Sequence, residues 1–130
     1  MSQPGDRVYT KEHEWLRIEG SSATIGITDY AQSSLGDIVY VELPKPGAQL
    51  ERSKPMGVVE SVKAVSDIYA PAAGTVSEIN SSVEDDPAKV NADPFGDGWL
   101  VKVTLQDPNA AAQGLLDAQA YADFVASLSH

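Results

Sequence analysis

The sequence predicts an all-β-dominated fold with short helices and a C-terminal α-helix. About seven or eight short segments rich in β-branched and aromatic residues are separated by glycine- and proline-rich turns, which is typical of a β-sandwich or barrel. The last segment instead places its apolar residues on one helical face. With 42% apolar residues among 130, the chain is large enough to bury a modest core in one domain, residues 1–130.

The first two strands are expected at residues 14–19 and 23–27. Residues 14–19 alternate apolar and charged side chains, as a half-buried strand does. Residues 20–22 are a glycine–serine turn, so the second segment returns beside the first as a hairpin.

A short helix and the most strand-like segment of the chain follow. The helix is expected at residues 30–35, because Asp29 followed three residues later by Gln32 resembles a capping box. Gly36 is placed to end this helix. Residues 37–43 are dense in β-branched and aromatic side chains and predict a strand.

Further strands are expected at residues 49–50, 56–61, 66–70, 75–79 and 99–105. Each is short, and glycine or proline lies near most of their ends, as in a sheet of closely spaced strands. Together with the earlier strands they complete a core domain at about residues 8–105.

The remaining segments predict helices and a linker. Asp86 as a cap and Pro87 at the first helical position predict one or two helical turns around residues 85–91. Residues 106–114 are polar and alanine-rich and are expected to be a linker, followed by a helix at 115–128. The apolar face of that helix comprises Leu116, Tyr121, Phe124, Val125 and Leu128.

Lys63 stands at the centre of a near-palindrome. Two β-prone arms of matched chemistry predict a tight hairpin with Lys63 and Ala64 as its two-residue centre. A lysine there holds its ammonium group in solvent, which suits an attachment point better than a binding pocket. The mirrored pairs are Val62 with Val65, Ser61 with Ser66 and Glu60 with Asp67.

Composition excludes several classes of function. The formal charge is −10, from 19 acidic and 9 basic residues, so binding to nucleic acid or to an anionic membrane is disfavoured. Without cysteine there is no disulfide and no thiol chemistry. His13 has only His130 as a possible histidine partner, which disfavours a metal site. No set of residues supports a nucleophilic enzyme.

The compartment is expected to be a bacterial-type cytoplasm. The N-terminal residues have no apolar h-region, and they are not rich in arginine and serine, so neither a secretory signal nor a transit peptide is expected. A mitochondrial matrix form is the alternative, with its transit peptide already removed.

The residues around Lys63 resemble the lipoyl-lysine motif of the glycine cleavage system H-protein family. The matching segments are Glu60-Ser61-Val62-Lys63-Ala64, Ser66-Asp67 and Tyr69-Ala70-Pro71. Further segments follow the order and spacing of that family over residues 8–128. They are Tyr9-Thr10-Lys11-Glu12-His13-Glu14-Trp15, Gly26-Ile27-Thr28-Asp29, Ala31-Gln32, Leu35-Gly36-Asp37, Val41-Glu42-Leu43-Pro44, Val90-Asn91 and Gly98-Trp99.

This resemblance implies a barrel-sandwich-hybrid lipoyl domain that is a covalent carrier and not an enzyme. Lipoate would be amide-linked to Lys63 after the action of lipoyl-attaching enzymes. The arm would take the aminomethyl group of glycine from a glycine decarboxylase (P protein) to an aminomethyltransferase (T protein). Dihydrolipoyl dehydrogenase (L protein) would then reoxidise the arm.

The resemblance also implies roles for the neighbours of Lys63. The presenting hairpin would comprise Glu60, Ser61, Val62, Ala64 and Asp67, and the residues docking the loaded arm would be Glu14, His13, Tyr30 and Asp67. For Glu60 and Asp67, recognition by enzymes and simple solubility remain equal alternatives. Tyr30 replaces a histidine of many family members and does not titrate near neutral pH, which disfavours a pH-dependent role at this position.

Three alternatives share the idea of a carrier. A biotin carrier is disfavoured, because Val62 and Ala64 flank Lys63 where methionines would be expected. A lipoyl domain serving another complex, such as a 2-oxo-acid dehydrogenase, is expected in a longer chain with further domains. A lipoyl or octanoyl donor in lipoate transfer would share Lys63 without needing glycine metabolism.

Overall fold

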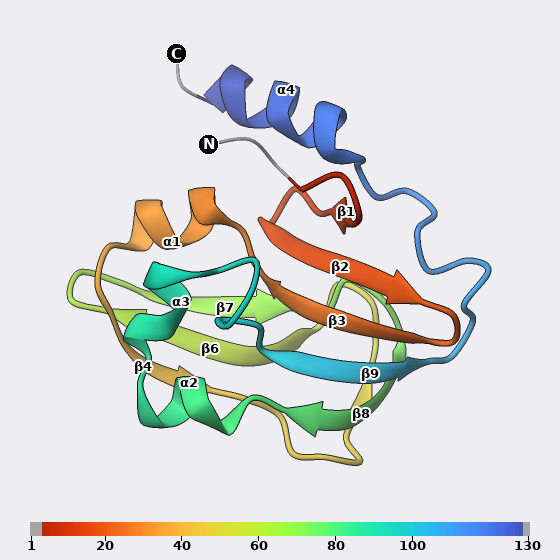
Figure 1. Cartoon of the computed structure of the whole chain (residues 1–130), viewed down its shortest axis with the longest axis horizontal. Helices are drawn as coiled ribbons and strands as arrows, with labels where there is room; N and C mark the ends of the chain where they lie inside the picture. Colours follow the sequence, from red (N-terminus) through yellow and green to blue (C-terminus); the bar gives the residue numbers. More distant parts are fainter. Residues whose placement is uncertain (1–3, 129–130) are drawn as a thin grey trace.

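Two antiparallel sheets face each other in the computed structural model, which describes residues 4–128 (Figure 1). One sheet has six strands in the order β1-β2-β3-β9-β8-β5, and the other has three in the order β4-β6-β7. Short helices and one C-terminal helix complete the chain, which confirms the predicted fold class. His130, considered above as a possible metal ligand, lies outside the described residues.

The predicted strands are present, with ends that differ by a few residues. The six-stranded sheet comprises β1 (Val8–Tyr9), β2 (Glu14–Glu19), β3 (Ser22–Ile27), β5 (Gln49–Leu50), β8 (Gly74–Ile79) and β9 (Val101–Leu105). The three-stranded sheet comprises β4 (Ile38–Glu42), β6 (Pro55–Ser61) and β7 (Val65–Tyr69). The sequence did not predict β1, because two residues are too few to show an alternating pattern.

The core lies between the two sheets and follows from strand alternation. In β4, Ile38 and Val41 are buried while Val39, Tyr40 and Glu42 are exposed. The side chains that fill the core are mainly β-branched, which suits the pleated surfaces that enclose them. They include Ile25, Val41, Val59, Ile68, Val76, Val101 and Val103.

Helix α1 (Asp29–Leu35) is capped one residue earlier than predicted. The hydroxyl of Thr28 accepts a hydrogen bond from the Ala31 backbone N–H at 3.2 Å, so Thr28 and not Asp29 is the N-cap. Asp29 instead accepts a bond from the Gln32 side-chain amide at 2.9 Å within the first turn. Gly36 ends the helix at φ 81°, a conformation that favours glycine, as predicted.

Two further short helices follow β8, and the sequence predicted only one. Helix α2 (Ser81–Asp85) was missed, and α3 (Ala88–Ala92) is the predicted helix. Asp86 ends α2 and does not cap α3, which begins after Pro87 without a side-chain cap. In Figure 1 these helices lie with α1 at the end of the sandwich where the β6–β7 turn projects.

Helix α4 (Ala118–Leu128) begins three residues later than predicted. Asp117 caps it, accepting a hydrogen bond from the Ala120 N–H at 2.8 Å. Leu116, expected within this helix, forms a β-bridge with Tyr9 instead. The ring of Tyr121 is buried and stacks on Tyr9 with centroids 4.8 Å apart, so the helix covers the β1 end of the larger sheet (Figure 1).

Replacing Gly26 with alanine should destabilise the fold. A Cβ atom on Gly26 would lie 2.5 Å from Trp15 Cζ2, and Trp15 is held in place because its indole N–H donates to the Ile27 and Pro94 carbonyls, both at 3.0 Å. Overpacking of this kind costs about 1–3 kcal/mol, measurable by urea unfolding. Gly5→Ala is the control, since a Cβ there meets nothing within 4 Å. Equal stability of the two variants would contradict this packing.

Candidate functional site

The β6–β7 hairpin places Lys63 at its turn, one position away from the predicted centre. The Ser61 N–H donates to the Ala64 carbonyl at 2.8 Å, and Glu60 pairs with Val65. The two turn residues are therefore Val62 and Lys63, and the predicted centre at Lys63 and Ala64 is wrong. In the predicted register Glu60 would pair with Asp67, two residues beyond its observed partner Val65. A shift by two residues keeps every side chain on the same face of the sheet. The two registers therefore bury the same residues, and only the position of the turn distinguishes them.

Ser61 and the start of β4 hold this turn in place. The Ser61 hydroxyl accepts hydrogen bonds from the backbone N–H groups of Ala64 (3.1 Å) and Lys63 (3.3 Å), as serine does in turns. The Val62 N–H donates to the Asp37 carbonyl at 3.1 Å. The backbone of the turn is thus fixed on two sides, while the side chain of Val62 remains 71% exposed.

Lys63 itself is exposed. Its Cε lies over the end of α1, 3.6 Å from where a Cβ on Gly36 would be. Within residues 4–128, no carboxylate oxygen lies within 4 Å of its ammonium group. The ammonium group is therefore accessible to an enzyme and is not part of an ion pair.

Asn91 of α3 fastens the segment on which the turn rests. Its side-chain oxygen accepts from the Ile38 N–H, and its amide donates to the Gly36 carbonyl and to the Gln32 side chain, all at 2.9 Å. These bonds join α1, α3 and β4 directly beneath Lys63. Asn91 is part of the Val90-Asn91 segment that resembles the family, but the sequence gave no indication that its side chain would join α1, α3 and β4.

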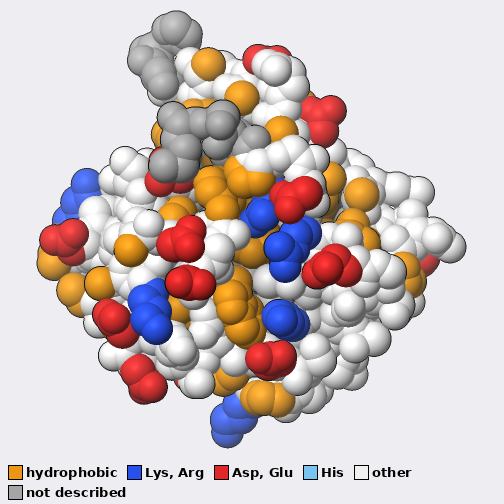
Figure 2. All heavy atoms as spheres, in the orientation of Figure 1, with side chains coloured by type: hydrophobic (Ala, Val, Ile, Leu, Met, Phe, Trp, Pro, Cys, Tyr) orange, Lys and Arg blue, Asp and Glu red, His pale blue; other side chains and the backbone are white. Residues whose placement is uncertain are grey.

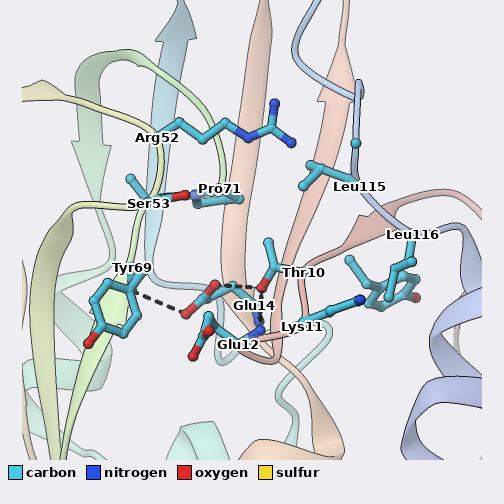
Figure 3. Close-up of a pocket in the computed structure, with 13 residues that line it drawn as sticks. Thr10, Lys11, Glu12, Glu14, Arg52, Ser53, Tyr69, Pro71, Leu115 and Leu116 are labelled. Carbon is cyan, nitrogen blue, oxygen red and sulfur yellow. Dashed lines mark hydrogen bonds between the residues drawn. The ribbon is translucent and has the colours of Figure 1, made fainter.

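A cavity of about 370 Å³ lies beside the start of β2 (Figure 3). The turn before β2, the end of β7, the turn after β5 and the segment before α4 all contribute to it. Its lining residues are Tyr9, Thr10, Lys11, Glu12, Glu14, Arg52, Ser53, Tyr69, Ala70, Pro71, Gly114, Leu115 and Leu116.

Glu14 is the buried carboxyl group of this cavity, with only 2% of its surface exposed. Its two oxygens accept hydrogen bonds from the Thr10 hydroxyl (2.6 Å) and from the Tyr69 N–H (3.1 Å), as Figure 3 shows. Burial raises the pKa of Glu14 to about 7, because removal from water disfavours the anion more than these bonds stabilise it. The carboxyl group therefore changes its charge near neutral pH.

The other predicted docking residues do not line this cavity. Asp67 is exposed on β7, opposite Val58. His13 and Tyr30 lie together, with ring centroids 4.6 Å apart, on the side facing α4. Of the predicted docking set, the structure brings only Glu14 into the cavity.

His13 takes part in a hydrogen-bonded chain. Its Nδ1 lies 2.7 Å from the Tyr121 hydroxyl, which lies 2.7 Å from the hydroxyl of Thr28, the cap of α1. Burial lowers the pKa of His13. Tyr121 thus connects α4 with the cap of α1, and His13 joins the turn before β2 to the same hydroxyl.

Thr10, Tyr69 and Arg52 are cavity residues that sequence reasoning did not single out. Tyr69 acts through its backbone N–H, which any non-proline residue provides, so no side-chain pattern could have marked it. Arg52 donates to the Gln113 carbonyl across the cavity mouth, a contact between residues distant in sequence.

Comparison with known proteins decides the family. The family model described as glycine cleavage H-protein matches residues 7–128. The chain belongs to the glycine cleavage H-protein family. This identity supports a lipoyl-carrier role in the glycine cleavage system, and it confirms the resemblance drawn from the sequence motifs.

Individual glycine cleavage system H proteins are similar over 80% or more of the chain. One from Rubrobacter xylanophilus is 57% identical over 104 residues, covering 80% of this chain and 82% of its own. Another, from Acidobacterium capsulatum, is 53% identical and covers 96% and 95%. The crystal structure of an H protein from Mycobacterium marinum superposes with a TM-score of 0.85 at 39% identity, covering 98% of this chain and all of that one. Within residues 4–128, no helix is long and apolar enough to cross a membrane.

Replacing Glu14 with glutamine should change how stability depends on pH. A carboxyl group whose pKa rises from 4.5 to about 7 on folding binds more protons in the folded state within that window. The wild type therefore loses stability as pH rises from 4.5 to 7, and glutamine, which does not titrate, removes this loss. Urea unfolding should show the wild type losing about 3 kcal/mol relative to Glu14→Gln over this window, with no further change above it. A difference independent of pH would contradict the assignment.

Proposed function

We propose that Lys63 is the covalent attachment site of lipoate and that the protein carries the aminomethyl group of glycine as a non-catalytic shuttle. The observation that carries this proposal is the exposed, unpaired ammonium group of Lys63 on a turn whose backbone is fixed by Ser61 and Asp37. Membership of the glycine cleavage H-protein family supports the choice of lipoate.

The residues around Lys63 fit a lipoyl group. Amide formation removes the positive charge of the lysine, and no ion pair has to be broken for it. The cavity at the far end of β7 is of a size to receive the tip of the arm. From Val65 to Tyr69 a strand spans about 13 Å, comparable with an extended lysine side chain lengthened by an eight-carbon acid.

When bound, lipoate supplies a dithiolane that accepts the aminomethyl group, releases it and is reoxidised. The protein's own contribution is to position Lys63 and the arm attached to it. Ser61 keeps the turn in one conformation, and the small side chain of Ala64 leaves room for an enzyme beside Lys63.

Glu14 is the residue we assign to a protonated amine within the cavity. A positive charge near a carboxyl group favours the anion, so an amine at this site would lower a pKa that burial has raised to about 7. The hydrogen bonds from Thr10 and Tyr69 hold the carboxylate in one orientation. His13, Tyr30 and Asp67 are not assigned to this contact, because they lie outside the cavity.

The partners in this proposal are the decarboxylase (P protein), the aminomethyltransferase (T protein), dihydrolipoyl dehydrogenase (L protein) and a lipoyl-attaching enzyme. The relatives compared above are bacterial, which supports a bacterial cytoplasm as the compartment.

Lys63→Arg should abolish lipoylation completely, since arginine has no primary amine to acylate. Protein produced with a lipoate source is measured by intact mass and peptide mapping. Lys45→Arg is the matched control, another exposed lysine in a turn, and should be modified like the wild type. A lipoyl adduct on Lys63→Arg would refute the attachment site.

Lipoylated protein should support exchange of carbon dioxide with the carboxyl carbon of glycine when the decarboxylase is present. The unmodified protein and Lys63→Arg should support less than about a hundredth of this rate, because the arm accepts the one-carbon unit. Radiolabelled bicarbonate measures the exchange. Lipoylation without exchange would favour a lipoyl donor or a domain serving another complex.

A further inference from the structure

The outer face of the three-stranded sheet combines apolar and acidic side chains directly beside the Lys63 turn. Residues that pair across strands point to the same face, so the register defines two rows there. The first row is Tyr40–Glu60–Val65, and the second is Glu42–Val58–Asp67. This set of six residues is called the outer face below.

A bulge in β4 increases the apolar area on this side. Ile38 pairs with Ser61 and Tyr40 with Glu60, so Val39 is an extra residue on β4. Bulges re-aim side chains, and Val39 and Tyr40 are consecutive and both exposed, by 57% and 46%. Regular alternation would have buried one of the two.

Exposed apolar side chains gather in this region. Among residues 4–128, five large apolar side chains are strongly exposed, and four of them are on β4 or at the hairpin: Val39, Tyr40, Val62 and Val65. The fifth, Leu128, is in the last turn of α4. Exposed apolar side chains close to charged ones are typical of a protein-binding surface.

The charge of the outer face has a single sign. Negative charge on Glu42, and then on Glu60 and Glu84, raises the pKa of the Tyr40 hydroxyl. Strands β4, β6 and β7 contain no lysine or arginine. Arg17 and Lys102 lie on β2 and β9 of the other sheet, and on the face viewed in Figure 2 lysine and arginine side chains are interspersed with acidic ones.

We propose that the outer face is the docking surface for the enzyme that attaches lipoate, which would present lysine and arginine side chains around an apolar socket for Tyr40. The proposal rests on the proposed function, because it takes Lys63 as that enzyme's target. An enzyme acting on Lys63 must cover the surface next to the turn, and the outer face continues from the turn through Val65 and Glu60. The acidic rows then steer a basic partner and fix its orientation.

Titration calorimetry with a purified lipoate–protein ligase tests this surface. The variants are Tyr40→Ser and Glu42→Gln, both at exposed positions where the fold should be unaffected. Leu128→Ser matches Tyr40 in exposure, at 45% against 46%, and Glu78→Gln removes the same charge from β8 of the other sheet. Tyr40→Ser and Glu42→Gln should each weaken binding about 3- to 10-fold, and the controls by less than about twofold. Added salt should weaken the wild type more than Glu42→Gln.

Binding that is equal in all four variants, or absent in the wild type, would overturn the docking surface. The intact mass of the protein, measured on the same samples, distinguishes failure of the docking surface from failure of the proposed function. If binding depends on Tyr40 and Glu42 but no adduct forms at Lys63, the docking surface is supported and the attachment site is refuted. If the adduct forms but the substitutions at Tyr40 and Glu42 leave binding unchanged, only the docking surface is refuted.

Discussion

The buried carboxyl group of Glu14 joins the two halves of the site. One oxygen accepts from Thr10, in the turn before β2, and the other from the backbone of Tyr69, at the end of the strand that leaves the Lys63 turn. A carboxylate removed from water is costly unless it is hydrogen-bonded, so these contacts keep the N-terminal segment and β7 together. The cavity exists between them, and its charge follows the protonation of Glu14 near neutral pH.

The lysine end of the site is built differently, with a fixed backbone and a free side chain. Asn91 fastens the junction of α1 and β4, and Asp37 in that junction accepts from Val62 of the turn. If Lys63 bears the arm as proposed, this division would present enzymes with a constant turn while only the arm has to move. The acidic and apolar outer face beside the turn would orient a partner without restricting the arm.

Alternation and turn residues were enough to predict the fold class, the principal strands and an exposed Lys63. Pairing register was not predictable, because a shift by two residues leaves Val59 and Ile68 buried in either case. Helix α2 was missed because five residues give too short a pattern and no proline marks its start, whereas Pro87 marks the start of the equally short α3. Of the four residues predicted to dock the arm, only Glu14 lines the cavity. Its partner Tyr69 was not predictable because it acts through a backbone N–H, and the positions of His13 and Tyr30 depend on how α4 packs.

The central claim is that an arm anchored at Lys63 reaches the Glu14 cavity. The most direct measurement is the amide NMR spectrum of the lipoylated protein before and after charging with glycine and the decarboxylase. The Tyr69 amide, which donates to Glu14, should change its chemical shift on charging, together with residues of the cavity wall. Changes confined to residues 61–65 of the turn would contradict the account.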